Sequence, residues 1–163
     1  MTEEQFVTTF GGVYEHSAWV ARETWARGIS APHDTAEGLA EAMAATVAAA
    51  GHARQLRLIK AHPDLAGRAA VRGELGAASA AEQSCAGLDQ CSAEEYARFQ
   101  SLNNRYQDKF GFPFVMAVRG NNRQAILAAF EIRIDNEYRT EFAKALSEID
   151  RIARFRLDAM GGA

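Results

Sequence analysis

The sequence predicts an all-α fold: a single compact domain over residues 1–163, built from roughly eight helices. Alanine is abundant and only three prolines occur, a composition that favours helices. Apolar residues recur three or four positions apart through most of the chain, which is the spacing of a helix face. The length suits one domain with a real hydrophobic core.

The composition excludes several classes of protein. The formal net charge of −3 gives no strong attraction to nucleic acid. No apolar run approaches the roughly 18 residues of a membrane span. The acidic start, Met-Thr-Glu-Glu, is unlike a secretory signal, and Cys85 and Cys91 are too far apart for a CxxC motif. We therefore expect a cytoplasmic protein with reduced thiols and no nucleic-acid or membrane partner.

Cap residues and glycines divide the first third of the chain into short helices. The expected elements are a helix that Thr2 caps and Gly11-Gly12 ends, a helix over 13–27, a loop over 30–34, a helix that Asp34 or Thr35 caps and that ends near Ala50, and a helix over 54–61. Residues 64–78 are rich in glycine and should form an irregular or weakly helical connection.

The rest of the chain repeats the same signals. Ser79 and Glu82 have the spacing of a capping box, with serine at N-cap and glutamate at N3, so a short helix should begin there. This helix should end near Gly87. The later elements expected are a helix that Ser92 and Glu95 cap and Gly111 ends, a helix that Asn121 or Asn122 caps, and a last helix over 137–160.

His62 stands directly before a proline, in the segment Ala61-His62-Pro63-Asp64-Leu65. Proline disfavours the α conformation for the residue before it, so we expect His62 at the end of a helix. A ring held there can point into a cleft and exchange a proton near pH 7. The alternative is a helix stop signal whose histidine only caps the last carbonyls.

The apolar run over residues 112–118 lies between Gly111 and Gly120 and is ambiguous between a strand and a buried turn. If it is extended within an all-helical protein, its amides have no sheet partner. Buried amides need some partner, and a polar ligand would serve.

Arg156 should face inward, since it shares a helix face with Ile149 and Ile152, whereas Arg154 should face water. An inward arginine needs an anionic partner or a position at the rim. It can form an internal ion pair, extend to the surface, or clamp a substrate carboxylate or ureido oxygen.

Other candidate residues have ordinary structural explanations. Glu82 needs no function if it completes a capping box, and Gln83 can bind an amide-like ligand or simply be solvated. Cys85 is expected to be a small apolar residue on a short helix. The four histidines show no metal-ligand spacing, and no GxGxxG, P-loop or GxSxG pattern occurs.

Several blocks together resemble the family of 2-oxo-4-hydroxy-4-carboxy-5-ureidoimidazoline (OHCU) decarboxylases. Their order and spacing carry the resemblance, and they cover nearly the whole chain. The blocks are Phe10-Gly11 with Tyr14-Glu15, His62-Pro63-Asp64-Leu65, Ser79 to Gln83 with Ala86-Gly87-Leu88, Leu102-Asn103 with Tyr106, Phe110 to Val115 with Ala117 and Gly120, and Ile152-Ala153 with Arg156-Leu157.

This resemblance implies an all-helical, cofactor-free enzyme, commonly a homodimer, that converts the ureidoimidazoline to (S)-allantoin and CO2 in urate degradation. It implies His62 as the catalytic acid/base and Glu82 as the second catalytic residue. The substrate-binding residues that it implies are Pro63, Ser79, Ala80, Ala81, Glu82, Gln83, Phe114, Val115, Met116, Ala117, Val118 and Arg156.

Two other functions stay open on the sequence. The chain could be a cofactor-free lyase or hydrolase that acts on a different ureide, which substrate profiling would separate. It could also be a non-enzymatic helical interaction module that docks a partner through residues 64–78, and such a module would tolerate substitution of His62 and Glu82.

Overall fold

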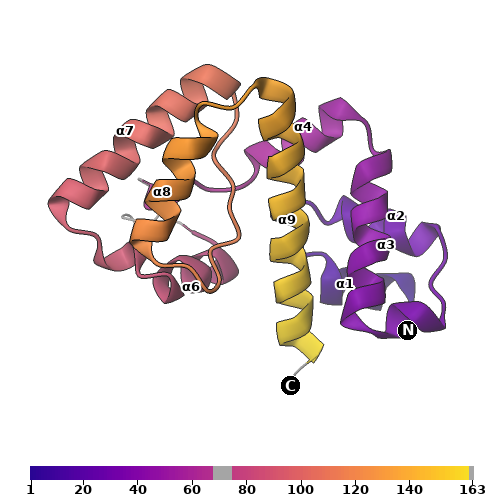
Figure 1. The fold of residues 1–163 in the computed structure, drawn as a ribbon. Coiled ribbons are helices and arrows are strands. Elements are labelled where there is room, and N and C mark those ends of the chain that lie inside the picture. Colours follow the sequence, from indigo (N-terminus) through magenta and orange to yellow (C-terminus); the bar gives the residue numbers. More distant parts are fainter. Residues whose placement is uncertain (68–74, 162–163) are drawn as a thin grey trace. The chain divides into compact units, whose positions relative to one another are not determined.

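A computed structural model describes residues 1–67 and 75–161 of the chain. Over these residues it contains eight α-helices, two short 3-10 helices and no strand (Figure 1). The all-α prediction and the expected number of helices are therefore confirmed. Residues 68–74 of the glycine-rich connection predicted over 64–78 lie outside the described residues. None of the described helices is long and apolar enough to cross a membrane.

The contacts between residues divide the chain into two compact units. The first unit contains Met1–Ala61 and Leu146–Ala163, and the second contains His62–Ala145. The last helix, α9 (Tyr138–Gly161), begins in the second unit and ends in the first.

The first unit is a set of short helices with sharply defined ends. Its elements are α1 (Glu3–Phe10), α2 (Trp19–Ala26), the 3-10 turn η1 (Ala31–Asp34), α3 (Ala36–Ala49) and α4 (His52–Lys60). The predicted caps are confirmed, since the side chains of Thr2 and Thr35 accept backbone N–H groups at the starts of α1 and α3. Helix α2 contacts both α1 and α3, so its apolar face is buried between them.

The predicted helix over 13–27 begins six residues late, at Trp19. His16 has a φ of 47°, which a right-handed helix does not allow. The Ser17 hydroxyl donates to the Glu15 carbonyl at 2.9 Å, so a local turn competes with the helix at this point. Residues 13–18 are consequently turns rather than helix.

The second unit contains α6 (Ala77–Cys85), the 3-10 turn η2 (Leu88–Gln90), α7 (Ala93–Phe110), α8 (Arg123–Arg133) and the start of α9. The Ser92–Glu95 capping box is confirmed, and Gly111 ends α7 with a φ of 74°. Asn122 caps α8. The core is aromatic: the Tyr106 ring contacts the rings of Phe110, Phe112, Phe114 and Phe130.

The buried face of α9 does not extend to the end of the helix. Ile149 and Ala153 are buried, but Met160 is 42% exposed. All of residues 159–161 are exposed, so no side of the last described turn is covered.

Candidate active site

His62 lies where the sequence predicted, two residues beyond the end of α4. Ala61 is the C-cap of that helix, and His62 follows it in a bend with only 8% of its surface exposed. Pro63 is half-buried. The histidine is therefore positioned by a helix end and a proline, and it is shielded from bulk water.

The backbone that follows His62 is bound by the side chain of Gln83. Its Oε1 accepts the Ala66 N–H at 3.0 Å, and its Nε2 donates to the Asp64 carbonyl at 3.2 Å. Gln83 is on α6, so these two bonds fix that helix against the His62 loop. Both the oxygen and the nitrogen of the Gln83 side-chain amide therefore bind this loop.

Two further side-chain amides, both from α7, bind the same loop. Gln100 donates to the Ala66 carbonyl at 2.7 Å, and Asn103 donates to the Leu65 carbonyl at 3.0 Å. Gln83, Gln100 and Asn103 together form what we call the amide clamp. Ala66 has a φ of 49°, a conformation that alanine rarely adopts. The clamp provides hydrogen bonds that offset this local strain.

The predicted capping box of Ser79 and Glu82 is wrong. Helix α6 begins earlier, at Ala77, and its N-cap is Gly76. The cause is local, because Ala77 and Ala78 are strong helix formers and extend the helix beyond the serine. Ser79 is therefore inside the helix and buried, and Glu82 lies well past the first turn. Glu82 therefore does not complete a capping box at the start of this helix.

Three of the five predicted residues on α6 share a face. Ser79, Glu82 and Gln83 follow the i, i+3, i+4 spacing. Ser79 and Gln83 are buried and Glu82 is half-buried, whereas Ala80 and Ala81 are exposed. The face that presents Glu82 is thus the one that Gln83 joins to the His62 loop.

The apolar run between α7 and α8 is neither strand nor helix, although most of it is buried. Within the described part of the chain, no hydrogen bond is found for the backbone N–H groups of Phe114, Val115, Met116 and Val118. The Phe114 side chain belongs to the core, since its ring stacks on that of Phe130 at 3.9 Å. The run therefore contains main-chain N–H groups that have no acceptor among the described residues, while the Phe114 side chain is part of the core.

A buried charged cluster next to this run was not predicted. Arg133 at the end of α8 pairs with Glu141 at 2.8 Å, and these residues are 6% and 0% exposed. Tyr106 and Asn136 also donate to the Glu141 carboxylate. A further nitrogen of Arg133, Nη1, donates to the Val115 carbonyl at 2.7 Å. We call Arg133, Glu141, Tyr106 and Asn136 the Arg133 cluster.

The cluster shifts the titration of its acids. Burial raises the pKa of Glu141, but hydrogen bonds from Arg133, Tyr106 and Asn136 outweigh this effect and leave the pKa below its usual value. Burial, followed by the bond to Glu141, raises the pKa of the Tyr106 hydroxyl. At neutral pH the cluster therefore holds a carboxylate and a neutral phenol.

A helix-face test would have found Arg133 in the sequence. It lies seven residues after Ile126 and three after Phe130, which are both buried on α8. The same helix spacing correctly predicts the inward direction of Arg156.

Arg156 belongs to the first unit and faces inward as predicted. Its Nη1 lies 3.1 Å from the Glu15 carboxylate and donates to the Val13 carbonyl at 3.2 Å. Both charged side chains are only 9% exposed, so they form an internal ion pair. Arg154 faces outward and bonds to Asp158 at 3.0 Å, also as predicted.

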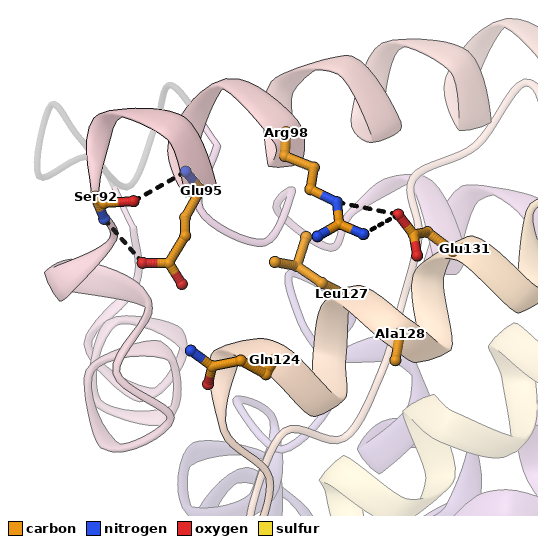
Figure 2. A pocket seen from close by; sticks show the side chains of 7 residues that line it. All are labelled: Ser92, Glu95, Arg98, Gln124, Leu127, Ala128 and Glu131. Atoms are coloured by element: carbon orange, nitrogen blue, oxygen red, sulfur yellow. Dashed lines mark hydrogen bonds and ion pairs between the residues drawn. The ribbon is translucent and has the colours of Figure 1, made fainter.

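An open hollow of about 330 Å³ lies between α7 and α8 (Figure 2). None of the predicted site residues lines it. Figure 2 shows that its charged side chains already have partners, because Arg98 bonds to Glu131 and Glu95 bonds to Ser92. Its lining residues are Ser92, Glu95, Arg98, Gln124, Leu127, Ala128 and Glu131. We do not assign the active site to this hollow.

The described residues contain no group of three or more His, Cys, Asp or Glu side chains that could hold a metal ion. Cys85 is exposed and Cys91 is partly exposed, and both are free thiols.

These features define an all-α protein in which a buried histidine follows a helix end and its loop is tied to a carboxylate-bearing helix. The family model for OHCU decarboxylase matches residues 1–158, and the chain belongs to that family. The 2-oxo-4-hydroxy-4-carboxy-5-ureidoimidazoline decarboxylase of Haloferax volcanii is 46% identical over 157 residues, which are 96% of this chain and 89% of that protein. The protein of the same name from Halalkalicoccus jeotgali is 44% identical over 158 residues, which are 97% and 86% of the two chains.

Other similar proteins are longer or more distant. The uric acid degradation bifunctional protein PucL of Bacillus subtilis is 40% identical over 96% of this chain, which spans 30% of that protein. A crystal structure of (S)-allantoin synthase has a TM-score of 0.76 and 32% identity, covering 98% of this chain and 50% of that one. A crystal structure of OHCU decarboxylase in the presence of (S)-allantoin has a TM-score of 0.74 over both whole chains, and at 20% identity it shows the fold alone.

Proposed function

We propose that this protein is a carboxy-lyase that converts OHCU to (S)-allantoin and CO2 in urate degradation. Family membership supports the reaction, since the relatives that match over most of their length carry this name. The structural observation that carries the proposal is the His62 loop, which Gln83 joins to the α6 face that presents Glu82. This arrangement supports a joint role for the His62 acid/base group and the Glu82 carboxylate.

The substrate explains why no cofactor is required. Decarboxylation leaves an electron pair on carbon, and an imine bond next to the carboxylated carbon of OHCU can accept that pair. The protein then has to orient the substrate and to move protons. His62 would take the proton of the substrate hydroxyl or protonate a ring nitrogen as CO2 leaves. Glu82 would orient His62 or accept a substrate N–H.

The main chain of Phe114 to Val118 would hold the planar ring and the ureido group. This proposal is supported by the backbone N–H groups of this buried run that have no acceptor among the described residues. Pro63, Ser79, Ala80, Ala81 and Gln83 would complete the walls, with Gln83 acting through the loop that it binds.

Arg156 would anchor a substrate oxygen away from the bond that breaks. A strong ion pair between Arg156 and the departing carboxylate would stabilise the ground state and slow the reaction. The ion pair with Glu15 partly neutralises the guanidinium and so favours a weak, orienting contact.

We further propose that the chain works as one domain, as a homodimer, and in the cytoplasm. The family resemblance supports the first two proposals, and the two free thiols support the third.

An optical assay tests the function. The unstable substrate is generated in place by oxidising urate and hydrolysing the first product, and allantoin is then followed by circular dichroism with a chelator present. Rapid growth of a single-handed signal on addition of the protein supports the decarboxylase. A signal no faster than spontaneous decay contradicts it and favours another ureide substrate or the interaction module.

A further inference from the structure

The peptide unit between Val115 and Met116 is bonded on one side only. Its carbonyl accepts the Arg133 guanidinium at 2.7 Å. Its N–H, which belongs to Met116, has no acceptor among the described residues. Met116 is also the one half-buried residue in the otherwise buried stretch 112–118.

The bond to Arg133 determines the direction of the Met116 N–H. No cis peptide bond occurs in the described chain, and in a trans peptide the C=O and N–H point to opposite sides. Fixing the carbonyl toward Arg133 therefore fixes the N–H away from it. A cationic donor on the carbonyl also polarises the peptide, which makes its N–H a stronger donor.

Arg133 is itself held rigidly. Its Nε and Nη2 bond to the Glu141 carboxylate at 3.1 and 2.8 Å, while Nη1 reaches Val115. Its guanidinium also lies 4.3 Å from the centre of the Phe114 ring. The planar group thus bonds to a buried carboxylate and to the Val115 carbonyl at once, which a lysine cannot do.

We propose that Arg133 is a positioning residue for the substrate. It orients and polarises the Met116 N–H so that this group donates to a carbonyl oxygen of the cyclic ureide. The inference rests on the proposed function, in which the main chain of 114–118 contacts the substrate. To that proposal the inference adds one specific donor, the Met116 N–H, and the side chain that orients it, Arg133.

The kinetic test is Arg133→Lys. Lysine keeps a positive charge beside Glu141 but loses the fork that also reaches Val115. A main-chain donor to the ring is used equally in the ground and transition states, so KM should rise roughly tenfold while kcat changes less than threefold. An unchanged KM, or a loss confined to kcat, overturns the proposal.

Tyr106→Phe is the matched control. It removes a hydrogen bond to Glu141 within the same buried cluster but leaves the contact between Arg133 and Val115 in place. Its KM should stay within about twofold of the wild-type value at a temperature where both variants are folded. An equal rise in KM for both variants would mean that cluster stability, not the Val115 contact, matters, and would overturn the proposal.

A spectroscopic test does not depend on turnover or on the folding of any Arg133 variant. The chain has four methionines, so ¹⁵N-methionine labelling gives few amide signals, and Met43 and Met160 serve as internal references. Met116→Leu assigns the Met116 signal. Saturation with (S)-allantoin should move the Met116 amide proton downfield and leave the two references nearly unchanged.

The outcomes separate the inference from the proposed function. If the wild type produces allantoin but the Met116 amide does not respond to saturating (S)-allantoin, the inference alone is overturned. If the wild type has no decarboxylase activity, the proposed function fails and the inference fails with it. If Arg133→Lys does not fold, Arg133→Met with Glu141→Gln removes both charges and should show the same rise in KM.

Discussion

The side chain of Gln83 binds the backbone of Ala66 and Asp64, on either side of Leu65, through the two ends of one amide. This contact crosses 17 residues of sequence and ties α6 to the loop that carries His62. Glu82 is the neighbour of Gln83 on the same helix. The distance between the two proposed catalytic side chains therefore depends on a residue whose own role is to position the loop.

Replacing Gln83 by methionine should weaken both stability and activity. Methionine has a similar length but cannot make either hydrogen bond, and buried backbone groups would be left unpaired. We expect a loss of about 1–3 kcal/mol in the free energy of unfolding, measured with urea, and a clear fall in kcat/KM. Gln124→Met, at an exposed position on α8, is the control and should change neither quantity. Full activity in the Gln83 variant would contradict the positioning role.

The internal ion pair of Arg156 and Glu15 permits a test of the substrate-anchor proposal. Arg156→Gln alone leaves a buried carboxylate without its cation, so it should lower stability as well as activity. Arg156→Gln with Glu15→Gln removes both charges and should regain most of the stability, measured by thermal unfolding. We expect KM to remain raised by roughly tenfold in this double variant, because the anchor is still missing. A wild-type KM would show that Arg156 is purely structural.

Glu141 should make the protein more stable at neutral pH than in acid. Its pKa is lowered in the folded state, so its contribution is fully present above the ordinary value of 4.5 and is lost as the pH falls through the lowered value. Glu141→Gln should be less stable at pH 7 and should lack this part of the acid dependence. Unfolding curves between pH 7 and pH 3 check the prediction, and parallel pH profiles for the two proteins would refute it.

Asp150 should behave in the opposite way. Burial raises its pKa above 3.8, although the hydrogen bond from Tyr14 at 2.8 Å lowers it in part. The folded state binds this proton more readily than the unfolded state, so the carboxylate costs stability well above the raised pKa. Asp150→Asn should be as stable as the wild type or more so at pH 7, and its advantage should shrink as the pH falls. An advantage that grows in acid would contradict the assignment.

Local signals in the sequence were enough for most of the fold. Thr2, Thr35, Ser92 and Asn122 all cap helices as predicted, because capping depends on residues only two or three positions away. Gly111 ends α7 for an equally local reason.

The prediction of a capping box at Ser79 was wrong because the two alanines before it extend the helix. The capping preference of serine and the helix preference of alanine are both local, and here the second is stronger. The predicted start of α2 was wrong because the spacing of apolar residues does not reveal the left-handed backbone at His16.

For the candidate site, too, local features were predictable from the sequence and long-range contacts were not. The place of His62 and the inward direction of Arg156 follow from a proline and from helix spacing, so the sequence predicted both. The hydrogen-bond partners of the side chains around the site cannot be predicted from these local features. Periodicity shows that Gln83 or Arg133 faces inward, but it contains no information on which distant backbone group each will meet. The amide clamp and the Arg133 cluster are therefore visible only in the folded chain.

The central claim is that His62 handles the proton in the decarboxylation, and His62→Asn tests it most directly. Asparagine preserves a polar side chain at the helix end but cannot act as an acid/base near pH 7. His52→Asn, at an exposed position on α4, is the control. Allantoin formation is followed by circular dichroism for both variants after thermal unfolding has shown that they are folded. We predict that turnover falls by roughly 10²–10⁴ for His62→Asn and stays at the wild-type level for His52→Asn. Near wild-type turnover by a folded His62→Asn variant would contradict the account.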